Sequence, residues 1–281
     1  GLASGSAYLF NAGTGAQFAK LLPADGAAAD SFGAAVAIDG DLVLIGAAGD
    51  DDNGLDSGSA YVFDAATGNQ LRKLVADDGA AGNSFGNSVA LSGSLALIGA
   101  TADDDNGADS GSAYVFDLVT GAQVAKLLPV DGQAGEQFGY TVAVDGEFAV
   151  IGAPGNDALG DRSGSVYLFD LGDMQQCAKY APDDMAEADE FGFAVDISNR
   201  YAIFGAPYQD GYYEPDTGAA YIGWIGSALP GDLNFDGCVD QQDLGLLLAA
   251  FNIDDGGDND GDGDTDASDL GILLAHYGQG C

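Results

Sequence analysis

Phe32-Gly-Ala-Ala-Val-Ala-Ile38 is the stretch on which the fold depends, because its opening dipeptide recurs at Phe85, Phe138 and Phe191. Each step between these phenylalanines is 53 residues long. A period of that size indicates stacked supersecondary units, each too small to bury its own apolar face. The greater part of the chain is therefore predicted to be a repeat array.

Each copy contains four short runs that are predicted to be strands. After the Phe-Gly run come Leu42-Val-Leu-Ile-Gly-Ala47, Gly58-Ser-Ala-Tyr-Val-Phe63 and Gln70-Leu-Arg-Lys-Leu74. Short β-branched and aromatic runs bounded by Gly and Asp are typical of strands, and four strands per copy is the layout of a propeller blade. The array shows no 3.6-residue period, which excludes a helical solenoid.

The phrases Ile151-Gly-Ala-Pro154 and Phe204-Gly-Ala-Pro207, together with Phe-Gly, resemble FG-GAP repeats, the blades of integrin-α-type β-propellers. The resemblance covers about residues 5–225 and implies a mainly β fold with four to five blades present. In that family calcium binds between the first and second strands of a blade. Here that connection is a turn such as Asp39-Gly-Asp41, which is too short to enclose an ion. The family's calcium sites are therefore not transferred to the array.

Acidic residues gather in the connection between the second and third strands of a copy, as in Asp50–Asp56 and Asp103–Asp109. Because strands alternate in direction, this loop shares one face with the connectors between copies, which carry Asp77-Asp78 and Asp183-Asp184. The sequence predicts one strongly negative face and one face of tight turns. The carboxylates either keep the array soluble, or they form a weak cation site or a docking face for a basic partner.

The fourth copy differs in the loop Tyr208–Asp216, and Trp224, the one tryptophan of the chain, lies on the following strand. Aromatic and acidic side chains together can bind sugars by stacking and hydrogen bonding. One interpretation places a glycan site at Tyr208, Tyr212, Tyr213 and Trp224. The other is a terminal blade adapted to cap the array and seat the next domain.

Two acidic loops follow the array, Asp232–Asp243 and Asp258–Asp269, each with glycine at its sixth position. Calcium takes roughly 6 to 8 oxygens, so one short loop must present alternate side chains and a backbone carbonyl around a sharp bend. We expect two Ca²⁺ ions, and a disordered acidic tail is the alternative. The expected ligands are Asp232, Asn234, Asp236, the Cys238 carbonyl, Asp240 and Asp243 in the first loop, and Asp258, Asp260, Asp262, the Asp264 carbonyl, Asp266 and Asp269 in the second.

Each loop is followed by a helical pattern with one apolar stripe, and the two stripes are expected to pack on each other. Loop-and-helix units repeated after 26 residues, with Asp at position 12, resemble a type I dockerin, the calcium-dependent module that binds cohesin domains. The resemblance implies a cohesin-like protein partner, contacted at loop positions 10 and 11. Those positions are Gln241 and Gln242 in one half but Ala267 and Ser268 in the other, which does not favour symmetric docking. The stripes are Leu244, Leu247, Leu248 and Phe251, and Leu270, Leu273, Leu274 and Tyr277.

The net charge of the chain limits its possible partners, and its length limits the number of domains. The chain has 45 acidic residues against 7 Lys and Arg, a net charge of −38, which disfavours nucleic acid and anionic membranes. No apolar run reaches the roughly 20 residues that span a bilayer. Two domains are expected, residues 1–228 and residues 229–281. The chain opens on the third strand of a copy and its ends do not pair into an even ring, so we expect an N-terminally truncated propeller.

Cysteine usage fits a secreted, extracellular or cell-surface protein. Cys238 and Cys281 fall where a duplicated module can bring its ends together, and whether they form a bridge is left open. Cys177 aligns with Phe18, Leu71 and Val124 in the other copies, so it is expected to be a buried core residue.

Catalysis finds little support in the sequence, which has a single histidine, His276, and no nucleophile triad, zinc spacing or phosphate loop. The leading hypothesis is a secreted, non-catalytic protein whose propeller is a recognition or adhesion surface and whose calcium module attaches it to an assembly. The alternative is a carbohydrate-binding or polysaccharide-degradation component that binds an extracellular glycan in the fourth copy.

Overall fold

The computed structural model describes residues 2–199, 201–209, 217–225, 239, 241–251 and 265–278. The chain divides into two compact units, Gly1–Gly223 and Trp224–Cys281. The division falls slightly before the boundary expected after residue 228.

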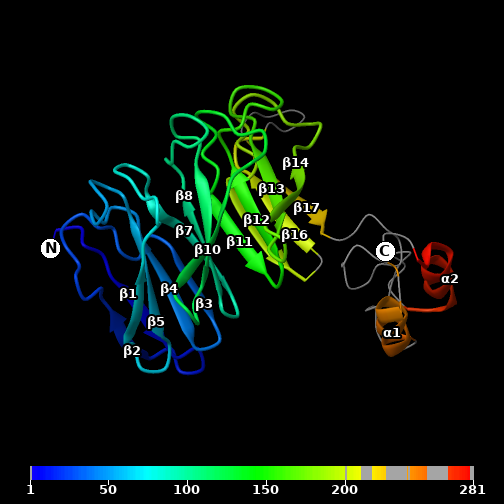
Figure 1. The fold of residues 1–281 in the computed structure, drawn as a ribbon, viewed down its shortest axis with the longest axis horizontal. Helices are drawn as coiled ribbons and strands as arrows, with labels where there is room; N and C mark the ends of the chain where they lie inside the picture. The colour runs from blue at the N-terminus through cyan, green and yellow to red at the C-terminus, as the bar shows by residue number, and fades with distance from the viewer. Residues whose placement is uncertain are drawn as a thin grey trace. The chain divides into compact units, whose positions relative to one another are not determined.

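The described part of the first unit is a series of five antiparallel sheets that follow one another along the chain (Figure 1). Each complete sheet has four strands in sequence order, as the repeat predicts. The sheets are β1 (Ala7–Phe10) and β2 (Gln17–Leu21); β3 (Val36–Asp39), β4 (Leu42–Ala47), β5 (Ser59–Asp64) and β6 (Gln70–Leu74); β7 (Phe85–Ser92), β8 (Leu95–Ala100), β9 (Ser112–Asp117) and β10 (Ala122–Leu127); β11 (Thr141–Asp145), β12 (Phe148–Ala153), β13 (Ser165–Asp170) and β14 (Gln175–Tyr180); and β15 (Ala194–Ser198), β16 (Tyr201–Ala206) and β17 (Ala219–Trp224).

Tight turns set the register of the first two strands in each sheet. Asp39 pairs with Leu42, so Gly40 and Asp41 alone form the turn between β3 and β4, and Gly40 has a φ of +53°. Two-residue hairpins that match the twist of a sheet need such positive φ values, which glycine adopts without strain. The predicted short connection is confirmed.

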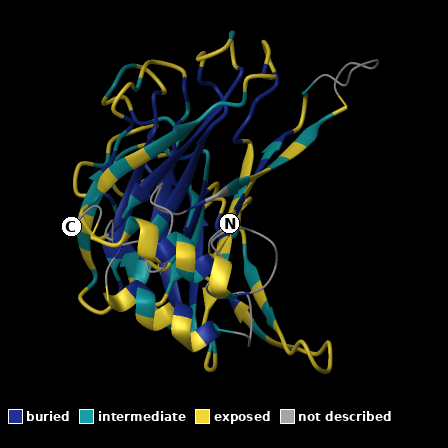
Figure 2. Ribbon diagram, turned by 90° about the vertical axis from the view of Figure 1, so that its right-hand side faces the viewer, coloured by how far each residue is buried: buried dark blue, intermediate teal, exposed yellow. Residues whose placement is uncertain are grey.

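The second and third strands of each complete sheet carry its core. β4 and β5 are buried along most of their length, whereas the loops at the two ends of the strands are largely exposed (Figure 2). The Phe-Gly phenylalanine packs against this core: the Phe32 ring lies edge-on against Tyr61 and Phe63 of β5, with ring centroids 5.5 and 5.9 Å away. Phe85 repeats this arrangement in the next copy. Buried edge-to-face aromatic packing therefore anchors each repeat.

Both glycine motifs serve one close approach between neighbouring sheets. A Cβ atom added to Gly46, in the Ile-Gly-Ala phrase of β4, would lie 1.9 Å from the carbonyl oxygen of Gly86 in the next Phe-Gly. Gly99 and Gly152 are crowded in the same way by Gly139 and Gly192. The recurring glycines thus allow the backbone of one copy to lie against the backbone of the next.

The described part of the second unit contains two helices, α1 (Gln241–Ala250) and α2 (Ala267–His276). Val239, Leu247 and Leu273 are fully buried in their small core, with Leu244 and Phe251 packed partly against it. Leu270 also packs there, so these positions of the two predicted stripes are confirmed. The expectation fails for Leu248, Leu274 and Tyr277, which are about half exposed, because two short helices bury only the centre of each stripe. Neither described helix is long and apolar enough to cross a membrane.

Candidate functional site

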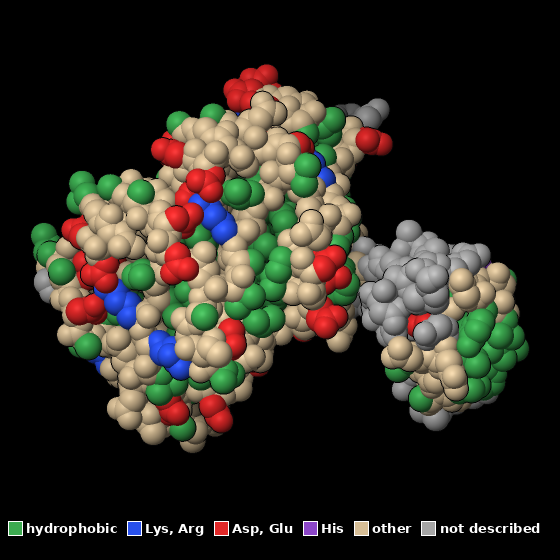
Figure 3. Space-filling model, viewed as in Figure 1, with side chains coloured by type: hydrophobic (Ala, Val, Ile, Leu, Met, Phe, Trp, Pro, Cys, Tyr) green, Lys and Arg blue, Asp and Glu red, His purple; other side chains and the backbone are tan. Residues whose placement is uncertain are grey.

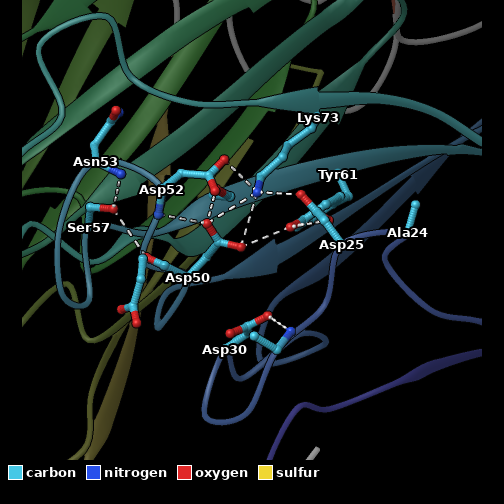
Figure 4. Close-up of polar contacts among 12 residues, drawn as sticks. Ala24, Asp25, Asp30, Asp50, Asp52, Asn53, Ser57, Tyr61 and Lys73 are labelled. Atoms are coloured by element: carbon cyan, nitrogen blue, oxygen red, sulfur yellow. Dashed lines mark hydrogen bonds and ion pairs between the residues drawn. The ribbon is translucent and has the colours of Figure 1, made fainter.

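One buried polar cluster recurs at the loop end of the sheets, and it is built around a lysine. In the first complete copy, the Lys73 Nζ atom on β6 lies 2.7 Å from Asp25, 3.2 Å from Asp50 and 2.6 Å from Asp52 (Figure 4). Asp25 belongs to the connector before the sheet, and the other two carboxylates belong to the acidic loop after β4. The predicted meeting of connector and loop on one face is confirmed, although a lysine neutralises part of its charge.

Asp50 is almost fully buried and is held by hydroxyl donors as well as by the ammonium group. The Ser59 Oγ and Tyr61 hydroxyl groups each donate to its carboxylate at 2.9 Å. Burial raises the pKa of Tyr61, and the neighbouring Asp50 carboxylate raises it further. Burial disfavours charge on Lys73, but hydrogen bonds to Asp25 and Asp52 outweigh it and raise the lysine pKa. With its pKa raised, Tyr61 stays protonated at neutral pH, and Lys73 stays charged.

The second complete copy repeats the cluster. Lys126 Nζ lies 2.7 Å from Asp78, 3.2 Å from Asp103 and 2.7 Å from Asp105, and Tyr114 donates to Asp103 at 3.1 Å. Figure 3 shows basic side chains on the surface with acidic side chains beside them. The first and second complete copies of the repeat thus form the same cluster.

The third copy departs from this pattern at two positions of its acidic loop and at one position before its first strand. Lys179 Nζ lies 2.6 Å from Asp131, but Asn156 stands where the second copy has Asp103, and Ala158 stands where it has Asp105. The buried acid of this copy is instead Glu136, which forms a pair with Asn156 and accepts a hydrogen bond from its amide at 2.6 Å. Burial raises the pKa of Glu136 above its usual value.

In the second copy the same pair has the opposite arrangement, because the Asn83 amide donates to the Asp103 carboxylate at 2.8 Å. Each of these two copies therefore keeps one buried acid and one amide at the pair.

Other loop acids stabilise the loop itself. A carboxylate oxygen of Asp51 accepts the backbone N–H of Asp56 at 2.9 Å, and Asp104 does the same for Asp109 at 2.8 Å. Within the residues that the structure describes, no group of three or more His, Cys, Asp or Glu is arranged to hold a metal ion. The weak cation site considered for these loops therefore has no support, since the lysine ammonium fills that role.

Calcium loops were predicted after the array, and only their final positions lie within the described residues. Asp243 and Asp269 are fully buried in the first turn of their helices. Asp269 accepts the backbone N–H of Asp266 at 2.7 Å, while Asp266 accepts that of Ser268 at 2.6 Å, so they form a capping box. The predicted ligands Asp232, Asn234, Asp236, Cys238, Asp240, Asp258, Asp260, Asp262 and Asp264 lie outside the described residues.

The predicted partner contacts Gln241, Gln242, Ala267 and Ser268 are all exposed at the starts of the two helices. Of the predicted glycan contacts, Tyr208 is 47% exposed just after β16. Trp224 ends β17, and its side chain lies outside what the structure describes, as do Tyr212 and Tyr213.

The expectation that Cys177 is a core residue is wrong, because it is exposed and its thiol is free. Its counterparts Phe18, Leu71 and Val124 are also at least half exposed, since all four lie on the outward side of the last strand of a copy. Cys238 and Cys281 fall outside the described residues, so their bridge stays a prediction.

The lysine clusters were missed from the sequence, although a signal was present. All four lysines of the chain, Lys20, Lys73, Lys126 and Lys179, are separated by the 53-residue period of the array. The serine and tyrosine that donate to Asp50 recur with the same period, as do the connector aspartates Asp25, Asp78, Asp131 and Asp184. Polar residues that keep the phase of a repeat indicate a shared buried network.

Comparison with known proteins identifies the family of the repeats. No curated protein matches the chain. Among solved structures, a computationally designed protein named Ika8 aligns with 17% identity and a TM-score of 0.45, over 77% of this chain and 51% of that one. The chain spans about half the length of that structure, and the likeness carries no argument. The FG-GAP repeat model, by contrast, matches residues 16–63, 69–116, 122–169 and 174–223, each ending in the third strand of a sheet, and the chain therefore belongs to the FG-GAP repeat family.

Proposed function

We propose that this chain is a secreted, non-catalytic binding protein, with its FG-GAP repeats as the blades of a propeller-type recognition surface and its second unit as a dockerin-like calcium module. One observation supports this most: Asp243 and Asp269, the last acids of the two loops, are fully buried at equivalent places in a duplicated unit. Buried carboxylates need compensating donors or a cation. Their placement favours ordered calcium loops over a disordered acidic tail.

The donor set fits a hard cation. Carboxylate oxygens are the ligands that Ca²⁺ prefers, and Asp243, Asp266 and Asp269 each supply a carboxylate at the expected loop positions. Asp243 would close the first loop and Asp269 the second, with the remaining predicted ligands completing each site. Bound calcium would offset the mutual repulsion of the aspartates and fix the starts of α1 and α2.

The array supports a binding role better than a catalytic one. In its described residues, the buried Asp50 and Asp103 carboxylates are paired with lysine, serine and tyrosine, so they form structural clusters. The single histidine, His276, has its Nδ1 atom 2.8 Å from the carbonyl oxygen of Ile272, within its own helix. The Ser59 hydroxyl that donates to Asp50 is itself fully buried, which does not favour a nucleophile open to a substrate.

A protein partner is the ligand proposed for the second unit. Hydrophobic side chains gather on its surface in Figure 3, and Leu246, Leu248, Leu274 and Tyr277 are each between 44% and 56% exposed. An exposed apolar patch rimmed by polar residues is typical of a docking surface. A cohesin-like domain is the class of partner that the dockerin resemblance suggests.

Calcium binding is tested by titration calorimetry on the full chain after chelation. Two ions should bind, and Asp269→Asn should remove one of them while Asp77→Asn, an exposed acid of the array, leaves both. Helical circular dichroism should fall on chelation, because the helix starts depend on the ions. Binding that is absent, or unchanged in both Asp243→Asn and Asp269→Asn, would contradict the proposal.

A glycan site in the fourth copy is the second candidate, and the exposure of Tyr208 favours it. A glycan array probed with the full chain would show saccharide binding that Tyr208→Ala and Trp224→Ala abolish. Tyr201→Ala, at an exposed tyrosine on the same sheet, is the control. Binding that survives both site variants would remove this candidate.

A further inference from the structure

One asparagine organises the loop between β12 and β13 in the third copy. The Asn156 Oδ1 atom accepts the Ser165 hydroxyl at 2.8 Å and the backbone N–H of Ala158 at 3.0 Å. The Asn156 carbonyl oxygen accepts the backbone N–H of Gly164 at 2.8 Å and the Ser163 hydroxyl at 3.2 Å. The shape of this loop therefore depends on the position of Asn156.

In the second copy an ion pair holds the equivalent side chain in place. That side chain is the carboxylate of Asp103, which lies 3.2 Å from the Lys126 ammonium group. Asn156 carries no charge, and the ion pair that Lys179 makes in the third copy is with Asp131. The loop of the third copy is therefore anchored at its central residue without an ion pair.

Glu136 holds Asn156 from the connector before the sheet. The Glu136 Oε1 atom accepts the Asn156 amide at 2.6 Å, and the residue is only 3% exposed. Its other oxygen, Oε2, is buried and has no hydrogen-bond partner within the part of the chain that the structure describes. Such a place suits a neutral carboxyl group, whereas an ionised one lacks the donors that it would have in water.

The charged and titratable groups around Glu136 come from the connector and from two strands. Burial has the largest effect and raises the pKa of Glu136, whereas the Gln133 backbone and the Lys179 ammonium on β14 lower it. Asp131 in the connector raises this pKa further. Tyr167 on β13 stays protonated, because burial raises its own pKa. Glu136 is therefore the group of this cluster that changes its charge at a pH above the usual range of a glutamate.

We propose that Glu136 and Asn156 form a pH-sensitive latch, which keeps the loop between β12 and β13 closed while Glu136 is neutral and loosens that loop when Glu136 ionises. Ionisation favours the open loop, because water then supplies the hydrogen bonds that Oε2 lacks in the closed one. The sign follows from linkage: a group whose pKa is raised in the closed state stabilises that state at low pH, and this contribution is lost as the pH rises. The second copy has no such latch, because the amide of Asn83 occupies the position of Glu136.

Hydrogen exchange on the full chain, read by mass spectrometry, tests the latch from about pH 5, just above the usual pKa of a glutamate, to about pH 8. After correction for the intrinsic pH dependence of exchange, the protection of residues 156–164 should fall by up to about tenfold per pH unit as the pH rises. Residues 103–111, the equivalent loop of the second copy, are the control within the same molecule and should keep their protection. An equal fall in both loops would assign the change to the whole array and overturn the proposal.

Variants at the latch separate its charge from its shape. Glu136→Gln does not ionise, so the protection of its loop should stay constant across the pH range. Glu136→Asn combined with Asn156→Asp gives the third copy the amide and acid of the second one, places a carboxylate where Asp103 meets its lysine, and should also remove the pH dependence. Glu147→Gln, at an exposed glutamate in the turn between β11 and β12, is the control and should behave like the parent chain. Loop protection that does not vary with pH in the parent chain, or that falls equally in Glu136→Gln, would overturn the proposal.

Discussion

The Nζ atom of Lys73 lies 3.2 Å from Oδ2 of Asp50, and the side chain of Asp50 is only 6% exposed. The aspartate enters from the loop after β4 and the lysine from the last strand of the same sheet, so their contact ties the acidic loop to the outer edge of the sheet. Removing the lysine would leave the buried Asp50 carboxylate without its positively charged partner, whereas a lysine that lost Asp50 would still contact Asp25 and Asp52.

Lys73→Met should therefore destabilise the array by about 3–5 kcal/mol, because it leaves a buried carboxylate uncompensated. Urea unfolding followed by tyrosine fluorescence measures the change. Lys179→Met is the matched comparison: Lys179 is more exposed and is paired with a single aspartate, so its loss should cost less. Equal losses in the two variants would contradict the role given to Asp50.

Tyr61→Phe should cost about 1–3 kcal/mol, because its hydroxyl donates to the buried Asp50 and also contacts Asp25 at 3.1 Å. Tyr8→Phe is the control at the equivalent position of the first sheet, where the side chain is about half exposed. Its effect should stay within about 0.5 kcal/mol. Thermal unfolding of the two variants beside the parent chain gives the comparison.

Glu136→Gln should change how stability depends on pH. Because burial raises the folded-state pKa of Glu136, this residue's favourable contribution is complete below its unfolded pKa, and it is lost as pH rises through the folded-state pKa. The glutamine variant does not ionise, so its stability relative to the parent should increase from acidic to neutral pH.

Urea midpoints measured from about pH 4 to pH 8 provide the test, with 4.3 as the usual pKa of a glutamate. A stability difference between Glu136→Gln and the parent chain that does not vary with pH would show that Glu136 keeps an ordinary pKa in the folded state.

Gly46→Ala should be among the most damaging single substitutions, with a loss above about 3 kcal/mol, because its Cβ would lie 1.9 Å from a backbone oxygen of the next copy. Gly245→Ala in α1 is the opposite case. Among the described residues, no atom outside the backbone of the helix itself lies within 4 Å of an added Cβ there, so the helix should gain up to about 1 kcal/mol. Circular dichroism melts of both variants test the pair, and similar signs would contradict it.

The strands could be predicted because the residues within each strand and its flanking turns determine its local backbone geometry. The Leu42–Ala47 strand was placed at its observed bounds, since apolar runs between Gly and Asp turns leave few alternatives. The partners of Lys73 could not be read in the same way: the chain offers 45 acids, and Asp25 is 48 residues away along the sequence. Only the 53-residue spacing of the lysines reduces the number of acidic residues that could be their partners.

The failures have physical reasons of the same kind. The alignment of Cys177 with Phe18 and Leu71 predicts a buried residue, but side chains at that position face outward on the edge strand of a sheet. Leu248 and Leu274 keep helical spacing yet stay exposed, because periodicity identifies a stripe without saying how much of it a second short helix can cover.

The acid and the amide occupy opposite positions in the Asn83–Asp103 and Glu136–Asn156 pairs. This exchange limits how duplicated repeats can diverge. If only one residue of such an acid–amide pair changed, the copy would hold either two buried amides beside a lysine or two buried acids. The first copy holds the second of these states, with Asp30 and Asp50 both almost fully buried at the same two positions. The three copies therefore preserve, within one chain, both end points of a compensated substitution and the two-acid state through which it can pass.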